Sequence, residues 1–551
     1  MDETMEDKLL GSGKECITDL KGRVWIESKK LWRVTTPAII TRVASFGILV
    51  VTQSFIGHIG ETDLAAYAII QIILVRFVNG ILLGMSSALE TLCGQAFGAG
   101  HNHMMGIYLQ RSWLVLFATA TILLPFFIFT ASILRHIGQE EELSAVAGNI
   151  SIWFIPVMYS FVFSMTMQMY LQAQRKNFII GWLSSVSFVA HLILSWLFVY
   201  KLNLGIPGAM GAMIISLWSV VIGEFIYVFG GWCPETWSGF SKHAFTAIWP
   251  VVKLSVSSGV MLCLQLWYNA VLVLLAGYMK NATIAISAFS ICLNINAWEL
   301  MISLGFFTGA CVRVANELGS GDAEAAKFAI KVNLCTSLSI GVIFSVLFFI
   351  FGHSLAYLFT SSTEVAKVVS SLAGLLATSV LLNSVQPVLS GVAIGGGWQS
   401  VVAYVNLGCY YIIGVPIGVL LGYVAKLDVK GIWIGMICGV ALQTVMLIWI
   451  TWRTDWDAQV ENASRRLNRE EFEWHHQMTV AAALPLIRSW SSVTEFFLVP
   501  YTSASTSLLI IVIAIVLRSH RDDTWDRVDM FSTIDLESIF WSVLPYTEVF
   551  N

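Results

Sequence analysis

The chain has 551 residues, of which 57% are hydrophobic and only 12% are charged, and its mean hydropathy is +0.75. Soluble domains are about half apolar and about a quarter charged, so this composition excludes a soluble protein and indicates a membrane protein with many spans. The formal net charge of −4 and the lack of a basic cluster give no support to a nucleic-acid partner.

The nine cysteines are scattered along the chain, and several lie inside apolar segments. None forms a C-x-x-C pair or a spacing typical of a metal site. We therefore interpret them as small buried residues and expect neither a metal nor a cofactor.

Lys21 to Trp32 mix basic and apolar side chains, which is typical of a short helix in the membrane interface. Segments of about twenty apolar residues follow, each long enough to cross a membrane. The predicted spans are Pro37–Gly57, Leu64–Leu89, Leu109–Ile133, Ala147–Leu171, Phe178–Tyr200, Gly208–Gly230, Val251–Ala276, Ile284–Phe307, Ala326–Phe351, Val365–Val388, Val401–Val424 and Gly431–Trp452.

These spans give two six-helix lobes, 37–231 and 251–452, joined by a linker at 232–250. An N-terminal tail with its interfacial helix (1–36) precedes them, and an atypical C-terminal tail (453–551) follows. The tail contains a further apolar segment at 496–517, interrupted by Pro500. A thirteenth span and a loosely ordered tail both remain open, and we favour the second.

Orientation follows from the distribution of Lys and Arg, which gather in cytoplasmic loops. Placing the N-terminus inside puts most basic residues of the connecting segments, among them Arg33, Arg175 and Arg313, on the cytoplasmic side. The acidic group Glu140–Glu142 then falls on the opposite side. We therefore expect the linker and both ends of the twelve-helix core to be cytoplasmic.

Two motifs, at the ends of the second and eighth spans, repeat one another. Gln95, Gly98 and Gly100 stand 221 positions before Asn316, Gly319 and Gly321, and Gly84 stands at the same distance before Gly305. Each copy follows two apolar segments and precedes a third, which indicates an internal duplication of six-helix units. We interpret the Gly-Ala-Gly at 98–100 as a tight turn between helices.

Three motifs in order, Leu89–Gly100, Arg313–Gly321 and Asn383–Gly391, make the chain resemble the plant branch of the multidrug and toxic compound extrusion (MATE) transporters, the DETOXIFICATION-like proteins. The resemblance runs from about Trp32 to Asn468. It implies an all-α fold of twelve transmembrane helices, in two pseudo-symmetric lobes around a V-shaped cleft.

The resemblance also implies secondary active transport. The expected cargo is a small organic compound, such as a secondary metabolite or a xenobiotic, exported or sequestered in exchange for protons. The expected location is the vacuolar or the plasma membrane, with membrane lipid around the chain. We expect the chain to act as a monomer.

Polar side chains inside predicted spans are the candidate functional residues, because hydrocarbon excludes them unless they have a role. Gln265 and Asn269 share a helix face, and Pro387 invites a kink in the tenth span. In the second lobe the candidates for a substrate cavity and for coupling are Gln265, Tyr268, Asn269, Asn294, Asn296, Glu299, Asn383, Gln386 and Pro387.

In the family that the chain resembles, the positions of Gln265 and Asn383 are commonly Glu and Asp. A buried carboxyl can carry a proton, whereas an amide cannot. Both positions are amides in this sequence, so proton coupling through them is in doubt. A role in lining the substrate site and neutral helix packing both remain open for these amides.

In the first lobe the candidates for lining the cleft are Gln53, Arg76, Asn79 and Glu90. The repeat places Arg76 at nearly the depth of Glu299, so we hypothesise that the two pair when the outward side closes and separate when it opens. A permanent structural ion pair is the alternative.

Three further ionisable residues have simpler interpretations. We expect Glu90 to hydrogen-bond the polar turn at its helix end, with a proton-carrying role as the alternative. His191 is expected to be a satisfied buried histidine, although proton handling stays open. We expect Glu224 to pack against a polar neighbour.

No Walker motif is present in the sequence, so ATP does not drive transport directly. Because the carboxylates are missing at 265 and 383, a pH-independent uniporter or an anion-permeable pathway of the same fold remains an alternative. A membrane enzyme would need a catalytic cluster of His, Asp, Ser or Cys, and none stands out in the sequence. We therefore expect a transporter and not an enzyme.

Overall fold

The computed structural model describes residues 20–246, 248–277, 282–356 and 363–469. Its regular elements in these ranges are all helical. Twelve helices or helix runs among the described residues are long and apolar enough to cross a membrane, which confirms the twelve predicted spans. The candidate thirteenth span, 496–517, lies outside the described residues.

The first lobe contains six of these spans, some of them made of consecutive helical pieces. Its elements are α2 (Leu20–Gly57), α3 (Glu61–Ile70) with the π-helical turn η1 (Gln71–Val75) and α4 (Arg76–Ala99), α5 (Asn102–Ile128), α6 (Thr130–His136), α7 (Glu141–Ala173), α8 (Asn177–Ser195) with η2 (Trp196–Lys201), and α9 (Gly205–Tyr227) with η3 (Val228–Trp232).

The second lobe repeats this order after a short 3₁₀ turn, η4 (Lys242–Phe245). Its elements are α10 (Ile248–Gly277), α11 (Ala282–Gly319), α12 (Ala323–Ala356), α13 (Thr363–Gly396), α14 (Gln399–Asn406) with η5 (Leu407–Gly414), α15 (Val415–Val419) and η6 (Leu420–Val424), and α16 (Asp428–Arg453). One more helix covers residues 456–469.

Several helices extend past the apolar segments that predict them. The separate interfacial helix expected at Lys21 to Trp32 is the first part of α2, which continues through Pro37 to Gly57. The expected third span is divided at Phe129, where α5 ends and α6 begins. Helices extend in this way because their polar ends still pack on other helices, so that Leu31 in α2 is buried.

The linker after α9 is attached to the first lobe. Thr236 accepts a hydrogen bond from Tyr170 of α7 at 2.7 Å. Gln110 of α5 donates from Nε2 to the Gly239 carbonyl at 3.0 Å and accepts from the Ser241 amide at 2.9 Å. These side chains fix the chain up to η4, two residues before α10 begins near residue 248.

The repeated motifs meet where α4 packs against α11, a contact that we call the seam. A Cβ on Gly98 would lie 2.0 Å from the carbonyl oxygen of Asn316, and a Cβ on Gly319 would lie 2.1 Å from that of Gln95. Only glycine allows this approach. Both copies of the repeat thus have these glycines because each lobe needs one for the close packing of α4 against α11.

Above the seam, each lobe packs its second span against the first span of the other lobe. Gly84 of α4 touches Gly259 of α10, and Gly305 of α11 touches Ile39 of α2. Two aromatic pairs also join the second span of one lobe to the first span of the other. Phe77 stacks on Trp267 at 5.2 Å, and Trp298 meets Phe46 edge-to-face at 5.0 Å. Members of the two pairs are again 221 positions apart.

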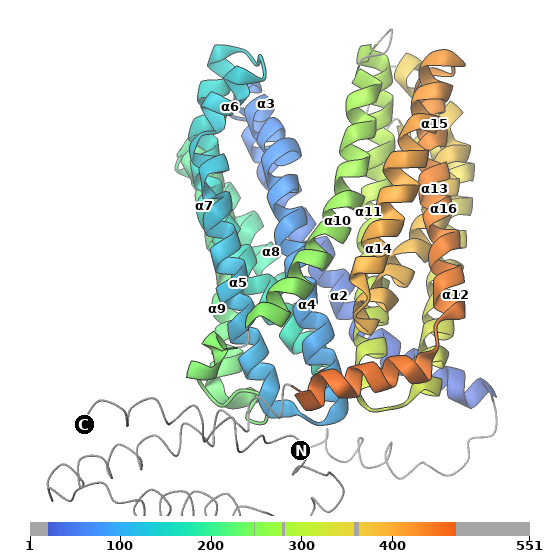
Figure 1. Ribbon diagram of the computed structural model, residues 1–551. Coiled ribbons are helices and arrows are strands. Elements are labelled where there is room, and N and C mark those ends of the chain that lie inside the picture. Colours follow the sequence, from blue (N-terminus) through green and yellow to red (C-terminus); the bar gives the residue numbers. More distant parts are fainter. Residues whose placement is uncertain (1–19, 247, 278–281, 357–362, 470–551) are drawn as a thin grey trace, which may run out of the picture. The chain divides into compact units, whose positions relative to one another are not determined.

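The two bundles, α2–α9 and α10–α16, meet at the end where α4 and α11 finish, and they diverge toward the end that carries α6 and α15 (Figure 1). The predicted orientation makes the joined end cytoplasmic. Gly100 and Gly321 both have positive φ there, +81° and +83°. A tight turn thus follows α4, as the Gly-Ala-Gly motif predicts, but Gly98 itself is helical and serves helix packing.

Candidate functional site

A buried carboxyl lies at the centre of the polar residues in the second lobe. Glu299 of α11 is only 4% exposed. It accepts a hydrogen bond from the Ser303 hydroxyl at 2.6 Å, and Asn383 Nδ2 of α13 lies 3.5 Å from its other oxygen. The same Asn383 nitrogen donates to Asn296 Oδ1 at 3.0 Å. Three predicted site residues from two helices are thus brought together.

A second polar group continues along α13. Gln265 of α10 donates from Nε2 to Gln386 Oε1 at 3.1 Å, and Gln386 donates to the Ser390 hydroxyl at 3.0 Å. Asn383 and Gln386 are one helical turn apart, so the two groups are neighbours on α13. Gln265 Oε1 is buried and has no hydrogen-bond partner among the described residues, so this acceptor is unpaired in the present conformation. Pro387 follows Gln386 within α13 and is buried.

Not every predicted residue of the second lobe joins these groups. Tyr268 is 1% exposed and donates its hydroxyl hydrogen to the carbonyl of Gly435 at 3.1 Å. Its ring stacks on Tyr410 at 4.4 Å, so it belongs to the packed core in this conformation, and its role in a cavity stays a prediction. The side chains of Asn269 and Asn294 lie outside the described residues.

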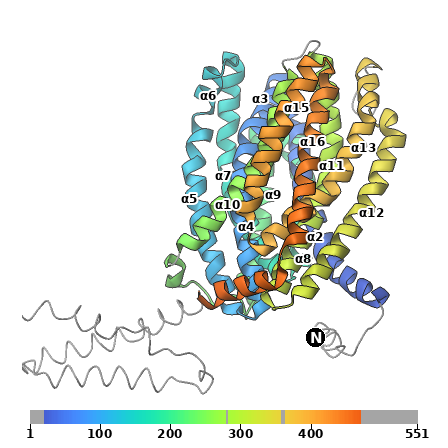
Figure 2. The same cartoon turned by 45° about the vertical axis from the view of Figure 1, so that its right-hand side comes forward.

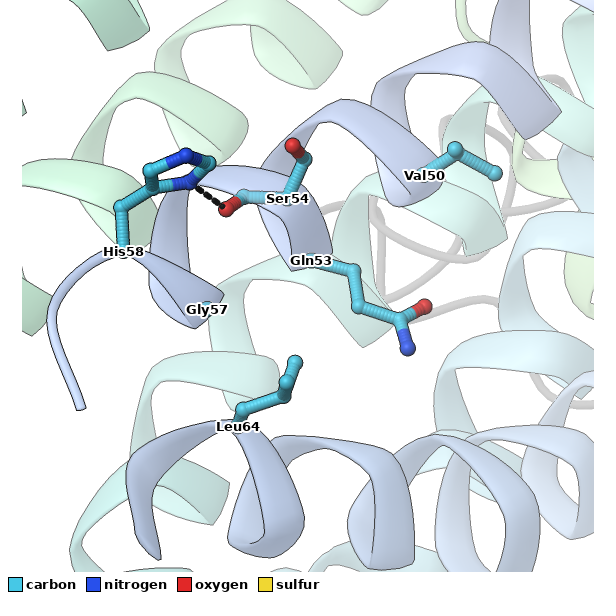
Figure 3. A pocket seen from close by; sticks show the side chains of 6 residues that line it. All are labelled: Val50, Gln53, Ser54, Gly57, His58 and Leu64. Carbon is cyan, nitrogen blue, oxygen red and sulfur yellow. Dashed lines mark hydrogen bonds between the residues drawn. The ribbon is translucent and has the colours of Figure 1, made fainter. Parts of the chain in front are cut away.

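The first-lobe candidates are dispersed. Gln53 is exposed and lines a pocket between α2 and α3 with Val50, Ser54 and Leu64 (Figure 3). Asn79 is half-buried on α4, with no hydrogen-bond partner for Oδ1 among the described residues.

Arg76 and Glu299 are not paired in this conformation. Arg76 is exposed at the start of α4, and the ion pairs found among the described residues do not include it. Since Glu299 is bonded to Ser303 instead, a permanent Arg76–Glu299 pair is ruled out. A pair that forms only when the outward side closes stays a prediction, and the spread bundles of Figure 1 agree with their separation here.

Glu90 differs from its predicted role. Helix α4 continues nine residues past it to Ala99, and Glu90 is 1% exposed instead of lying at an emerging helix end. Its carboxylate lies near the Arg42 guanidinium of α2 and near the Cys311 thiol of α11. The expected bond to the polar turn is therefore wrong, because the apolar segment ends before the helix does.

His191 and Glu224 are both fully buried in the first lobe. Thr52 and Ser216 hydroxyls lie 3.1 and 3.3 Å from the two ring nitrogens of His191, which confirms it as a satisfied buried histidine. Glu224 of α9 faces the polar side chains Gln168 and Ser164 of α7, as expected for a carboxyl beside a polar neighbour.

Sequence reasoning missed Ser303 and Ser390. Each stands four residues after a predicted site residue on the same helix, Glu299 and Gln386, and this spacing is a signal that could have found them. Arg42 and Cys311 carried no such signal, because each contacts Glu90 from another helix. Among the described residues, no group of three His, Cys, Asp or Glu side chains could hold a metal ion.

Comparison with known proteins decides the family. The family model described as MatE matches residues 37–197 and 258–420, one range in each lobe. Protein DETOXIFICATION 21 of Arabidopsis thaliana is 55% identical over 450 residues, covering 82% of this chain and 91% of that protein. The chain belongs to the MATE family. Protein DETOXIFICATION 24 of the same plant is 49% identical over 497 residues, covering 89% of this chain and 99% of that protein.

Solved structures agree with the MATE assignment. The crystal structure of the eukaryotic MATE transporter AtDTX14 has a TM-score of 0.77 at 31% identity and covers 80% of this chain and 99% of its own. An outward-facing multidrug resistance MATE family transporter has a TM-score of 0.71 at 15% identity, covering 80% and 97%, and shows the shared fold alone.

These relatives establish what the chain is. It is an integral membrane protein with many spans and a transporter, and its relatives are transporters and not enzymes. MATE transporters handle small organic substrates, typically with ion coupling.

Proposed function

We propose that this MATE transporter exchanges protons for a small organic compound and that Glu299 carries the proton. The observation that supports this most is the composition of the second-lobe site, where one carboxyl stands among amides and hydroxyls. Amides and hydroxyls do not ionise near neutral pH, whereas a buried carboxyl can bind and release a proton there. Gln265 and Asn383 cannot serve, and Glu299 is within hydrogen-bond reach of Asn383.

The surroundings of Glu299 suit antiport. An ionised carboxylate that is buried needs a positive or hydrogen-bond-donating partner. Among the described residues Glu299 has hydrogen bonds from Ser303 and Asn383 but no ion pair. A bound proton supplies neutralisation in one conformation, and a donating group of the cargo supplies it in the other. Each then displaces the other, which couples their movements in opposite directions.

The cargo that fits this site is a secondary metabolite or a xenobiotic. Asn296, Asn383 and Gln265 are half-buried amides that offer neutral donors and acceptors. Trp298, adjacent to Glu299, is 43% exposed and offers an aromatic face for planar compounds. With the predicted orientation, such cargo leaves the cytosol across the vacuolar or the plasma membrane.

Uptake into inside-out vesicles, with and without an imposed pH gradient, tests this function. A panel of planar compounds, cationic and phenolic, first identifies a transported one. One proton per cycle and a gradient of one pH unit support up to about tenfold accumulation. We expect Glu299→Gln to abolish that accumulation, while Glu224→Gln, a matched buried carboxyl in the first lobe, keeps it. Wild-type uptake that ignores the gradient would overturn the proposal.

A pH-independent uniporter is the second candidate, supported by the two amides at 265 and 383. Gln265→Glu separates the two candidates, because it puts back a carboxyl at the position where the family commonly has one. If only that variant responds to the gradient, the wild type works as a facilitator. If uptake by the wild type already depends on the pH gradient, a group other than residue 265 carries the proton, and Glu299 is the first one to test.

A further inference from the structure

Two pseudo-equivalent amides close the seam, one from each lobe. Gln95 of α4 donates from Nε2 to the carbonyl oxygen of Gly395 on α13 at 3.0 Å. Asn316 of α11 donates from Nδ2 to the carbonyl oxygen of Ala173 on α7 at 3.4 Å. The two donors are related by the repeat, and the two acceptors lie at the ends of the corresponding helices α13 and α7. Each hydrogen bond joins the two lobes, so both must break before the lobes can separate at this end.

The two amides differ in what holds their side-chain oxygen. Gln95 Oε1 accepts a hydrogen bond from Arg466 Nη1 at 3.1 Å. Asn316 Oδ1 has no hydrogen-bond partner among the described residues. A guanidinium can only donate, so Arg466 holds the oxygen of Gln95 and turns its NH₂ group toward the other lobe. A charged donor also makes this bond stronger than one between neutral groups.

Arg466 comes from a helix that lies outside the two repeats. Residues 456–469 follow α16 and cross the end of the bundle where α4 and α11 finish (Figure 1, Figure 2). Trp456 and Ala463, seven residues apart and thus on one helix face, are buried in an apolar cluster that also contains Val314 of α11. This packing presents Arg466 to the seam.

The turn between α13 and α14 leaves room for the guanidinium. Gly397 has a φ of +81°, and a Cβ there would lie 2.8 Å from Arg466 Nη1 and 2.9 Å from Nη2. The corresponding turn in the first lobe, between α7 and α8, has Arg175 at a φ of +62°. The glycine that accommodates Arg466 in one lobe is therefore replaced by a residue with a side chain in the other.

We propose that Arg466 is a positioning residue of the transport cycle. It orients Gln95 so that the seam stays closed, and it thereby raises the population of the conformation in which the lobes are joined at the predicted cytoplasmic end. The amide of Asn316 lacks this support, so the bias comes from the 456–469 helix and not from the repeat. The proposal rests on alternating access in the MATE fold and is independent of proton coupling through Glu299.

Cys311 reports opening of the seam, because its fully buried thiol contacts Glu90 of the other lobe. The full-length chain in membrane vesicles is treated with N-ethylmaleimide, and mass spectrometry measures the labelling of each cysteine. We expect Arg466→Ala to speed Cys311 labelling about tenfold, since losing a hydrogen bond from a charged donor shifts an equilibrium by roughly that factor. Arg465→Ala, whose exposed side chain pairs with Glu461, should leave the rate unchanged.

Cys292, fully buried in the core of the second lobe on the same helix, is the internal reference for folding. Arg466→Lys keeps a charged donor, so its labelling rate should lie between those of wild type and Arg466→Ala. If Cys311 is labelled at the same rate in Arg466→Ala as in the wild type, the proposal is wrong. Parallel labelling of Cys292 and Cys311 would also reject it, because Arg466 would then stabilise the whole lobe.

Discussion

Both lobes contain polar side chains in their interior, but the cluster around His191 and the cluster around Gln265 and Asn383 differ in burial and in hydrogen bonding. In the first lobe His191 is fully buried and both ring nitrogens have hydroxyl partners. In the second lobe the amides of Gln265 and Asn383 are half-buried, and Gln265 Oε1 has no hydrogen-bond partner among the described residues. A fully buried and satisfied cluster stabilises a fold, whereas a half-buried cluster with an unpaired acceptor is the better candidate for binding a ligand.

The repeat shows how this difference is encoded. An offset of 221 residues maps the second-lobe site onto apolar, buried positions of the first lobe. Gln265, Asn296, Glu299 and Asn383 correspond to Ala44, Val75, Val78 and Val162, all less than 10% exposed. The glycines and amides of the seam, by contrast, are retained in both copies. Duplication thus preserved the contact between lobes, and the site exists in one lobe only.

The largest expected effect is on folding, when a carboxylate is placed at the equivalent positions 44 and 265 of the two lobes. Ala44→Glu puts an unpaired carboxylate into the packed first lobe and should cost about 3–5 kcal/mol of folding free energy. Gln265→Glu is half-buried beside the Gln386 amide and should fold normally. Size-exclusion chromatography of detergent extracts measures the yield of folded protein. Equal yields from the two variants would contradict the difference between the lobes.

A smaller effect is expected from His191→Leu. The Thr52 and Ser216 hydroxyls keep backbone acceptors at Ile48 and Ala212, so only the bonds to the imidazole are lost. We expect the free energy of unfolding to fall by about 2 kcal/mol. Uptake should keep its dependence on the pH gradient, because the first-lobe cluster is structural. Thermal unfolding in detergent and vesicle uptake measure the two effects.

The opposite result for His191→Leu would show that the first lobe takes part in proton coupling. That result would be a His191→Leu protein of unchanged thermal stability whose uptake no longer responds to the gradient. Ser185→Ala on the same helix is a suitable control, since Ser185 bonds only the carbonyl of Gly181 among its described partners.

The spans and the duplication could be predicted from the sequence because length, hydropathy and glycine spacing report directly on membrane crossing and close helix contact. The direction of individual side chains could not. A helix inside a membrane bundle is apolar on every side, so its pattern does not tell which face meets the site. Glu90 shows the same limit at a helix end, since the apolar segment stops while α4 continues to Ala99.

Tyr268 illustrates how the side chain direction was missed. It stands three residues after Gln265, a spacing that suggests a shared face. In the structure its ring stacks on Tyr410, and its hydroxyl lies where two glycines leave room for it. A Cβ on Gly414 or Gly439 would lie only 2.3 or 2.5 Å from that oxygen. These glycines, far away in the chain, determine where the ring goes.

The smallest effect should therefore come from Tyr268→Phe. The variant keeps the stacked ring but loses the hydrogen bond to the Gly435 carbonyl. Because this bond is buried, we expect the free energy of unfolding to fall by about 1 kcal/mol. Cargo affinity and gradient dependence should not change, since Tyr268 faces the core and not the amides. Thermal unfolding and concentration-dependent uptake check both statements, with Gln386→Ala as the matched site variant. A changed apparent affinity at unchanged stability would return Tyr268 to the substrate site and show that the second lobe has a larger accessible interior than this conformation presents.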